Sequence, residues 1–162
     1  MNELRRALPF LAFALAVFIA GCTLLPGPFR PSSPSPTSTP TEIEAAQAAW
    51  AVAGIDDYRL DIGFLCGCSL AGNAVVDVVD GKLVSVQLNG TEIAPDTAAP
   101  FGLTIDGLLA EGDRAVDQGG TVAATFDPAT GAPVRLDIDY MPTAIDDELT
   151  IVVNSLTPAP GN

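Results

Sequence analysis

Hydrophobic residues follow a helical period in the first segment of the chain that has a clear pattern. Apolar side chains recur at helical spacing over residues 42–54, and Gly54 ends the run. Thr41 and Glu44 fit the capping-box pattern T-x-x-E, in which each side chain bonds the backbone N–H of the other residue. The pattern predicts a first helix over residues 42–54, with Trp50 on its buried stripe.

A strict alternation of apolar and polar residues begins at Tyr58 and predicts a strand with one buried face. The even-numbered positions are apolar and are expected to point toward the core: Tyr58, Leu60, Ile62, Phe64 and Cys66. Trp50 and Tyr58 would then be core residues, with a ligand cleft as the less favoured alternative.

Residues 73–88 predict a hairpin around Asp80-Gly81, and the loop length decides which residues share a face. A two-residue loop places Asp77 opposite Val84. A three-residue loop, 79–81, pairs Val76 with Val84 and collects the apolar residues on one face. We therefore expect the three-residue loop.

The second half of the chain repeats the same sequence of elements. Thr104 caps a second predicted helix, and strands follow over 122–126, 134–140 and 149–153. The predicted order is α-β-β-β-α-β-β-β. It indicates a single α+β domain over residues 42–156, in which two helices cover one face of an antiparallel sheet.

The residues before this domain have the pattern of an export signal. Two arginines precede an unbroken apolar run over 7–20, which is shorter than the ~20 residues that span a bilayer. The run ends in Ile19-Ala20-Gly21-Cys22, which resembles the lipobox of bacterial lipoproteins. That resemblance implies cleavage after residue 21 and a lipid on Cys22, with an ordinary signal peptide as the alternative.

Proline, serine and threonine dominate residues 23–41 and predict a disordered spacer. The predicted organisation is a signal peptide over 1–21, a lipidated cysteine and tether over 22–41, the domain over 42–156 and a disordered tail over 157–162. The domain would face the extracytoplasmic side of the bacterial cell membrane or the outer membrane, anchored through its lipid.

Charge and composition exclude several classes of function. The chain has 7 basic and 20 acidic residues and no histidine. Without residues 1–21, 5 basic and 19 acidic residues remain, a net charge of −14. So acidic a chain repels nucleic acid, and catalytic triads or metal sites that need histidine are ruled out. No catalytic constellation and no cofactor are expected.

Cys66 and Cys68 are the two cysteines that remain if Cys22 carries lipid. Residues i and i+2 of a strand lie ~6.6 to 6.8 Å apart at Cα, at the limit for a disulfide, and a bend at Gly67 would shorten that distance. An exported protein meets an oxidising compartment, so we favour a structural disulfide. Free buried thiols, a redox role and Cu(I) binding are the alternatives.

Five carboxylates fall near the last predicted hairpin, and they are the candidates for a calcium site: Asp137, Asp139, Asp146, Asp147 and Glu148. Calcium takes six to eight oxygen ligands, but no loop here has the spacing of a known calcium motif. We expect a solvated acidic face and turn-capping side chains rather than a metal site or an acid–base pair.

Several short motifs follow one another along residues 50–153: Trp50, Ile55 and Tyr58; Cys66 and Cys68; Asp80-Gly81; Thr104-Ile105-Asp106 and Leu108; Phe126-Asp127-Pro128, Gly131 and Pro133; Ile138-Asp139; and Asp146-Asp147-Glu148. Together they resemble a bacterial lipoprotein family catalogued as domain of unknown function 6174. Gly67, Ser69 and Leu109 depart from its usual pattern. The resemblance implies an exported, often lipid-anchored domain, and it assigns no functional residues.

The sequence thus predicts a lipid-anchored envelope lipoprotein that works as a non-enzymatic binding module, with an envelope protein as its partner. The alternative is a thiol–disulfide redox or Cu(I)-handling protein that uses Cys66 and Cys68.

Overall fold

The computed structural model describes residues 37–69 and 71–159. The predicted signal peptide, the lipobox with Cys22 and the tether up to residue 36 lie outside the described residues, as do residues 160–162 of the predicted tail. Among the described residues, no helix is long and apolar enough to cross a membrane.

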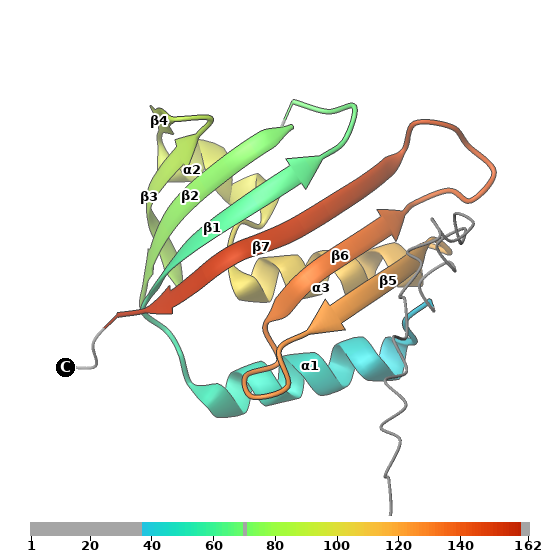
Figure 1. Cartoon of the computed structure of the whole chain (residues 1–162), viewed down its shortest axis with the longest axis horizontal. Coiled ribbons are helices and arrows are strands. Elements are labelled where there is room, and N and C mark those ends of the chain that lie inside the picture. The colour runs from blue at the N-terminus through green and yellow to red at the C-terminus, as the bar shows by residue number, and fades with distance from the viewer. Residues whose placement is uncertain (1–36, 70, 160–162) are drawn as a thin grey trace, which may run out of the picture. The chain divides into compact units, whose positions relative to one another are not determined.

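The domain is built on one seven-stranded sheet in which all neighbouring strands are antiparallel, so the predicted α+β class and antiparallel sheet are confirmed (Figure 1). The strand order across the sheet is β4-β3-β2-β1-β7-β6-β5. The strands are β1 Tyr58–Leu65, β2 Gly72–Val79, β3 Lys82–Leu88, β4 Thr91–Ile93, β5 Thr121–Phe126, β6 Pro133–Asp139 and β7 Glu148–Pro158. Two meanders, β1–β4 and β5–β7, therefore meet where β1 pairs with β7.

Two long helices, α1 Pro40–Ala53 and α3 Ile105–Asp117, pack together against the sheet (Figure 1). Three short elements lie in the segment between β3 and α3, where the predicted order contains no helix or strand: β4, helix α2 Pro95–Ala98 and 3-10 helix η1 Ala99–Phe101. Each has only three or four residues, too few for a periodic pattern to reveal.

Helix α1 begins two residues earlier than predicted, because its N-cap is Thr39 and not Thr41. The Thr39 hydroxyl accepts a hydrogen bond of 3.3 Å from the backbone N–H of Glu42, and the Glu42 carboxylate accepts one of 2.6 Å from the backbone N–H of Thr39. Both T-x-x-E patterns are present in the sequence, but only this one places Pro40 at the first helical position, where proline is favoured.

The predicted three-residue loop of the β2–β3 hairpin is wrong. Val79 pairs with Lys82, so the loop has two residues, Asp80 and Gly81, both with positive φ. This geometry matches the right-handed twist of the strands. Val84 is an extra residue at a bulge, after which Val76 pairs with Val86. The bulge keeps Val76 and Val86 on the core face in spite of the shorter loop, whereas Val84, which the predicted register placed on that face, is 52% exposed.

The predicted inward face of β1 is confirmed, and so is the core position of Trp50 and Tyr58. Tyr58, Leu60, Ile62 and Phe64 are buried, and Trp50 is 4% exposed. The Trp50 and Tyr58 rings meet edge to face, with centroids 5.6 Å apart. The indole N–H donates a hydrogen bond of 3.3 Å to Asp106 at the start of α3.

The sheet splits along the second half of β7. β1 pairs with β7 as far as Pro158, whereas β6 pairs with β7 only between Glu148 and Val152. Pro133, the first residue of β6, has no N–H to donate to a neighbouring strand. On β7, Asn154 is an extra residue at a bulge opposite β1. The pairing of β6 with β7 therefore ends beside these two irregular positions.

Candidate functional site

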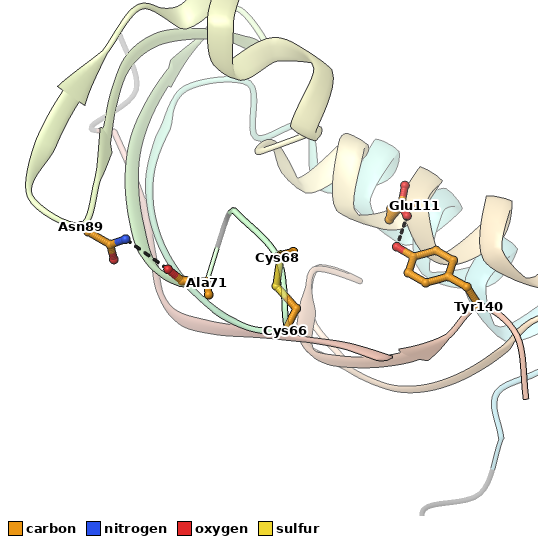
Figure 2. The surroundings of a disulfide bond; sticks show 6 residues. All are labelled: Cys66, Cys68, Ala71, Asn89, Glu111 and Tyr140. Atoms are coloured by element: carbon orange, nitrogen blue, oxygen red, sulfur yellow. Dashed lines mark hydrogen bonds between the residues drawn. A yellow bond between two sulfur atoms is a disulfide. The ribbon is translucent and has the colours of Figure 1, made fainter. Parts of the chain in front are cut away.

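Cys66 and Cys68 are joined by a disulfide with their Cα atoms 5.2 Å apart, directly after the last residue of β1 (Figure 2). The expectation that both side chains face the core is wrong, because Cys66 is only half-buried and Cys68 is exposed. The strand ends at Leu65, so the alternation of faces does not continue through Gly67.

The chain that follows the disulfide is held to β3 through Asn89. The Asn89 side chain donates a hydrogen bond of 3.1 Å to the carbonyl of Ala71 (Figure 2). It also accepts one of 2.8 Å from the N–H of Asn73. The β1–β2 connection is thus fixed by a covalent bond at its start and by hydrogen bonds at its end.

A cavity of about 270 Å³ lies against the disulfide, and it brings the two cysteines together with the acidic loop Asp146-Asp147-Glu148. It is lined by Cys66, Gly67, Cys68, Tyr140, Asp146, Asp147, Glu148 and Leu149. We call it the disulfide cavity. The sequence singled out the cysteines and the acidic loop separately, and only the fold shows that they are neighbours.

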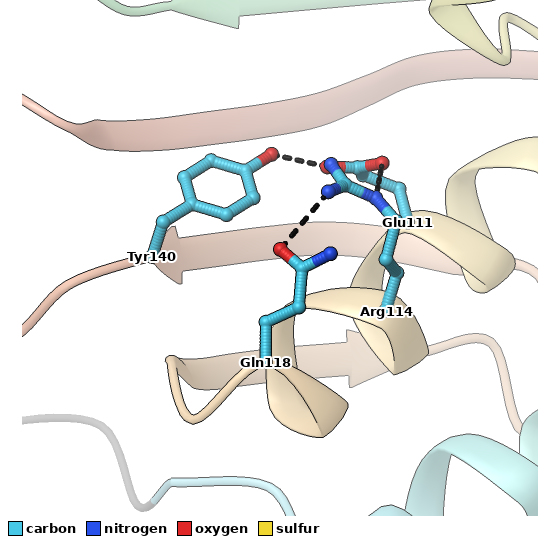
Figure 3. Close-up of polar contacts among 4 residues, drawn as sticks. All are labelled: Glu111, Arg114, Gln118 and Tyr140. Atoms are coloured by element: carbon cyan, nitrogen blue, oxygen red, sulfur yellow. Dashed lines mark hydrogen bonds and ion pairs between the residues drawn. The ribbon is translucent and has the colours of Figure 1, made fainter.

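Tyr140 connects this cavity to helix α3 through a polar cluster that the sequence did not predict (Figure 3). Its hydroxyl donates a short hydrogen bond to the Glu111 carboxylate. Arg114 also bonds that carboxylate, donates a hydrogen bond of 3.1 Å to the side-chain amide oxygen of Gln118 and lies 5.6 Å from the centre of the Tyr140 ring. The i, i+3 spacing of Glu111 and Arg114 was the one visible signal.

The environment of Tyr140 favours the neutral phenol. Burial, and then the hydrogen bond and charge of Glu111, raise the pKa of Tyr140, whereas Arg114 partly opposes that rise. The hydroxyl therefore stays protonated at neutral pH and acts as a hydrogen-bond donor to Glu111. This arrangement holds the end of β6 to α3 rather than providing a base.

The five acidic candidates divide between two cavities. Asp146 and Asp147 line the disulfide cavity, Asp137 and Asp139 line another of about 330 Å³, and Glu148 lines both. Across residues 37–69 and 71–159, no three histidine, cysteine or acidic side chains are grouped as metal ligands would be.

The Asp137 carboxylate is bonded by two other side chains of the domain. Arg135 bonds both of its oxygens, each at 2.6 Å, and the Thr150 hydroxyl donates a further bond of 2.7 Å. Partial burial alone would raise the pKa of Asp137, but the bonds from Arg135 and Thr150 outweigh it and lower that pKa. Asp137 thus behaves as an ion-pair partner on the open face of the sheet.

The charges around the disulfide work against thiol chemistry. Reactive cysteines lie in electropositive surroundings that stabilise the thiolate. Here three carboxylates line the cavity with the sulfurs, and Glu111 lies behind Tyr140. Any thiolate that forms or approaches meets like charge, so the surroundings suit a structural link better than a redox centre.

A third cavity, of about 390 Å³, lies where the sheet splits. One wall is β7, from Val153 to Pro158, and the other is the start of β6 with the turn before it. The lining is mixed: Ile55, Asp127, Thr130, Ala132, Pro133, Val134, Val153, Asn154, Ser155, Leu156 and Pro158. We call it the β7 groove. Its volume is in the range of ligand sites, ~300–1,000 Å³.

Sequence reasoning missed the β7 groove entirely. Pro133 was the one available signal, since proline is excluded from the middle of a sheet. Which strand would be left without a partner depends on the strand order, and that order is set by contacts between distant parts of the chain.

Comparison with known proteins gives one match. No curated protein and no solved structure matches the chain significantly. A family model described as "Family of unknown function (DUF6174)" matches residues 42–158. This span includes every strand and both long helices except the first two residues of α1. The chain therefore belongs to this family of unknown function.

Proposed function

We propose that the protein is a lipoprotein of the bacterial cell envelope, anchored through Cys22, whose folded domain is a non-enzymatic binding module. The domain would be displayed on the extracytoplasmic side of the cell membrane or the outer membrane. The observation that carries the binding role is the β7 groove, which has ligand-site volume, a mixed apolar and polar lining, and one wall made by a strand edge.

The arrangement of charge supports a protein partner rather than nucleic acid. Four basic and 19 acidic residues lie within 37–69 and 71–159. A surface of this charge repels phosphate backbones and attracts cationic proteins. The anchor and spacer add to this argument, because a tether allows the domain to reach partners some distance from the bilayer.

Lipid anchoring is tested by comparing the wild-type protein with Cys22→Ser in the bacterium that makes it. The wild-type chain is expected in the detergent phase of a Triton X-114 extraction, with a mass that includes acyl chains. Cys22→Ser should lose that mass. An unmodified Cys22 in the mature wild-type protein would refute the anchor and leave the binding role to be tested separately.

Binding at the groove is tested by placing a photo-crosslinking amino acid at Val134, which is 43% exposed and lines the groove. Val52, 88% exposed on α1, is the matched control outside the groove. Irradiation of intact cells should give a discrete adduct from position 134 and none from position 52. Equal labelling from both positions, or none from either, would contradict a binding role for the groove.

The second candidate function is thiol–disulfide exchange or Cu(I) handling by Cys66 and Cys68. The exposure of Cys68 and the adjoining cavity favour it, since a reaction partner has access to the sulfurs. The surrounding carboxylates weigh against it. Replacing both cysteines by serine should lower stability without loss of reductase activity or Cu(I) binding. A measurable loss of either activity would favour this candidate.

A further inference from the structure

The free edge of β7 provides backbone hydrogen-bonding groups to the groove. Within the described part of the chain, Val153 and residues 155–158 pair with β1 on one side and with no strand on the other, and Asn154 is the bulge residue between them. In an antiparallel pair, successive residues alternate between bonding the partner strand and pointing away from it. The groups that point away from β1 here must point toward the groove.

The register identifies Leu156 as a residue whose backbone faces the groove. The N–H of Ala159 donates a hydrogen bond of 2.9 Å to the carbonyl of Asp57, one position outside the Tyr58–Pro158 pair. That bond makes Tyr58–Pro158 a non-hydrogen-bonded pair. Leu156 lies two residues before Pro158, so its N–H and C=O also point away from β1. Both groups are available to a new strand.

The opposite wall does not satisfy these groups. It begins with Pro133, which has no N–H, and continues with Val134, whose side chain is exposed. Ile55 and Val153 add apolar surface along the groove. The site therefore combines unpaired backbone with apolar contacts, the two features by which sheet edges bind extended peptides.

Charge determines which extended segment fits. Asp127 lines the groove, and the described residues carry 19 acidic against 4 basic side chains. A second copy of this chain would bring an equally acidic surface to the edge, and like charges oppose its approach. A basic segment has the complementary charge.

We propose that the β7 groove binds an extended, basic segment of a partner protein, which adds as a strand to the edge of β7. This inference rests on the proposed binding function and specifies its partner class. The partner's backbone bonds Leu156, its apolar side chains contact Ile55 and Val134, and its lysines or arginines lie near the acidic surface.

The first test uses defined peptides and the full chain purified in detergent. The probe is a short fluorescent peptide of alternating lysine and valine, with fluorescence anisotropy as the readout. It should bind, and the same peptide methylated at every backbone nitrogen should bind at least about tenfold more weakly. A peptide of alternating glutamate and valine should not bind. Equal binding by the methylated peptide would overturn strand addition.

The second test uses the matched variants Leu156→Pro and Leu156→Ala. Both lose the same apolar side chain, and both keep the charge of the protein, so non-specific attraction of the lysine peptide is unchanged. Only the proline variant lacks the N–H that faces the groove. Leu156→Pro should bind the peptide about tenfold more weakly than Leu156→Ala. Equal affinities would overturn the proposal, and the methylated peptide tests the same backbone bonds if the proline variant does not fold.

Analytical ultracentrifugation over a series of protein concentrations tests whether a second copy of this chain occupies the edge of β7 instead. The wild-type chain should stay monomeric in detergent. A dimer that Leu156→Pro abolishes would assign the edge to a second copy and refute the basic partner. Crosslinking from position 134 together with failure of the peptide tests would leave the proposed binding role standing and refute strand addition alone.

Discussion

The hydroxyl of Tyr58 accepts a hydrogen bond of 2.9 Å from the backbone N–H of Ile105. Tyr58 is the first residue of β1 and Ile105 the first of α3, so this buried bond ties the sheet to the start of a helix. The first N–H groups of a helix have no partner within it, and here a side chain from another element provides one.

Replacing Tyr58 by phenylalanine is expected to lower the free energy of unfolding at neutral pH by about 1–3 kcal/mol, because the N–H of Ile105 is then buried without a partner. Urea unfolding followed by circular dichroism measures the change. Tyr140→Phe is the control and should cost less, since its partner Glu111 keeps its ion pair with Arg114. A neutral effect of Tyr58→Phe would mean that the bond contributes nothing net.

Alkaline pH should weaken the fold through the same residue. Burial, assisted by the charges of Asp106 and Asp56 and opposed by the Ile105 hydrogen bond, raises the pKa of Tyr58 from 10 to about 12. The pKa of Tyr58 is therefore higher in the folded chain than in the unfolded chain. The stability that the neutral Tyr58 hydroxyl contributes is complete below pH 10 and is lost as the pH rises through about 12.

The measurement is the stability of wild-type and Tyr58→Phe chains between pH 9 and about 12. Tyr140 titrates in both proteins, so the difference between them isolates Tyr58. The wild-type advantage should shrink as pH rises. A constant difference across this range would show that Tyr58 has the same pKa in the folded and unfolded chains.

Gly131 lies where the β5–β6 turn meets helix α1, and its substitution should be costly. It has φ +77°, and a Cβ there would lie 2.8 Å from the Cβ of Ala49 and 2.9 Å from the N of Trp50. We expect Gly131→Ala to cost about 2–4 kcal/mol, the sum of the left-handed conformation and the overlap.

Gly81→Ala is the matched control, since Gly81 has φ +69° but nothing lies within 4 Å of the position that a Cβ would take there. It should cost only the conformational part, about 1–2 kcal/mol. Thermal unfolding of both variants gives the comparison. Equal losses would show that helix α1 moves away from the turn without penalty.

The Cys66–Cys68 disulfide should contribute modestly to stability and react selectively with thiols of different charge. A link that closes so short a loop contributes about 1–2 kcal/mol in the chain-entropy model. Because carboxylates line the cavity beside it, cysteamine, which is cationic, should reduce it faster than the anionic mercaptoethanesulfonate. Intact-mass spectrometry follows the reaction, with a gain of about 2 Da on reduction.

Glu148→Gln tests whether negative charge causes the preference for the cationic thiol, since the Glu148 carboxylate lines the cavity and is exposed. The variant should reduce the preference for the cationic thiol by about two- to threefold, the effect of one charge at short range in water. The short peptide LCGCS in its oxidised form is the reference for intrinsic reactivity. An unchanged preference in the variant would remove the electrostatic explanation.

Local patterns were sufficient to predict the main elements and the buried face of β1. In β1 the apolar residues Tyr58, Leu60 and Ile62 alternate with polar residues or glycine. This alternation is so regular that only one face of the strand can be buried. The hairpin register was not predictable by the same reasoning, because the bulge changes the pairing, exposes Val84 and still leaves Val76 and Val86 on the core face. Two arrangements thus gave nearly the same pattern of faces.

The candidate sites depended on contacts that sequence does not display. Tyr140 and Glu111 come from the end of a strand and from a helix, and nothing in their local sequence indicates that they meet. The β7 groove exists because the last strand extends past Pro133 of its neighbour, which requires the strand order to be known. The cysteines were recognisable as a pair, but their acidic surroundings were not.

The pairing of β1 with β7 also has a kinetic consequence. Each meander joins strands that are close in sequence, but the two meanders are joined by strands from opposite ends of the domain, where Asn154 bonds Asp61 across 93 positions. Closing such a long loop costs more entropy than closing a hairpin, so we expect this pairing to form late. Until β7 arrives, β1 has an open edge at the centre of the future sheet. Folding speed should therefore depend on when the last strand becomes available, and truncation before β7 would remove the middle of the sheet rather than its margin.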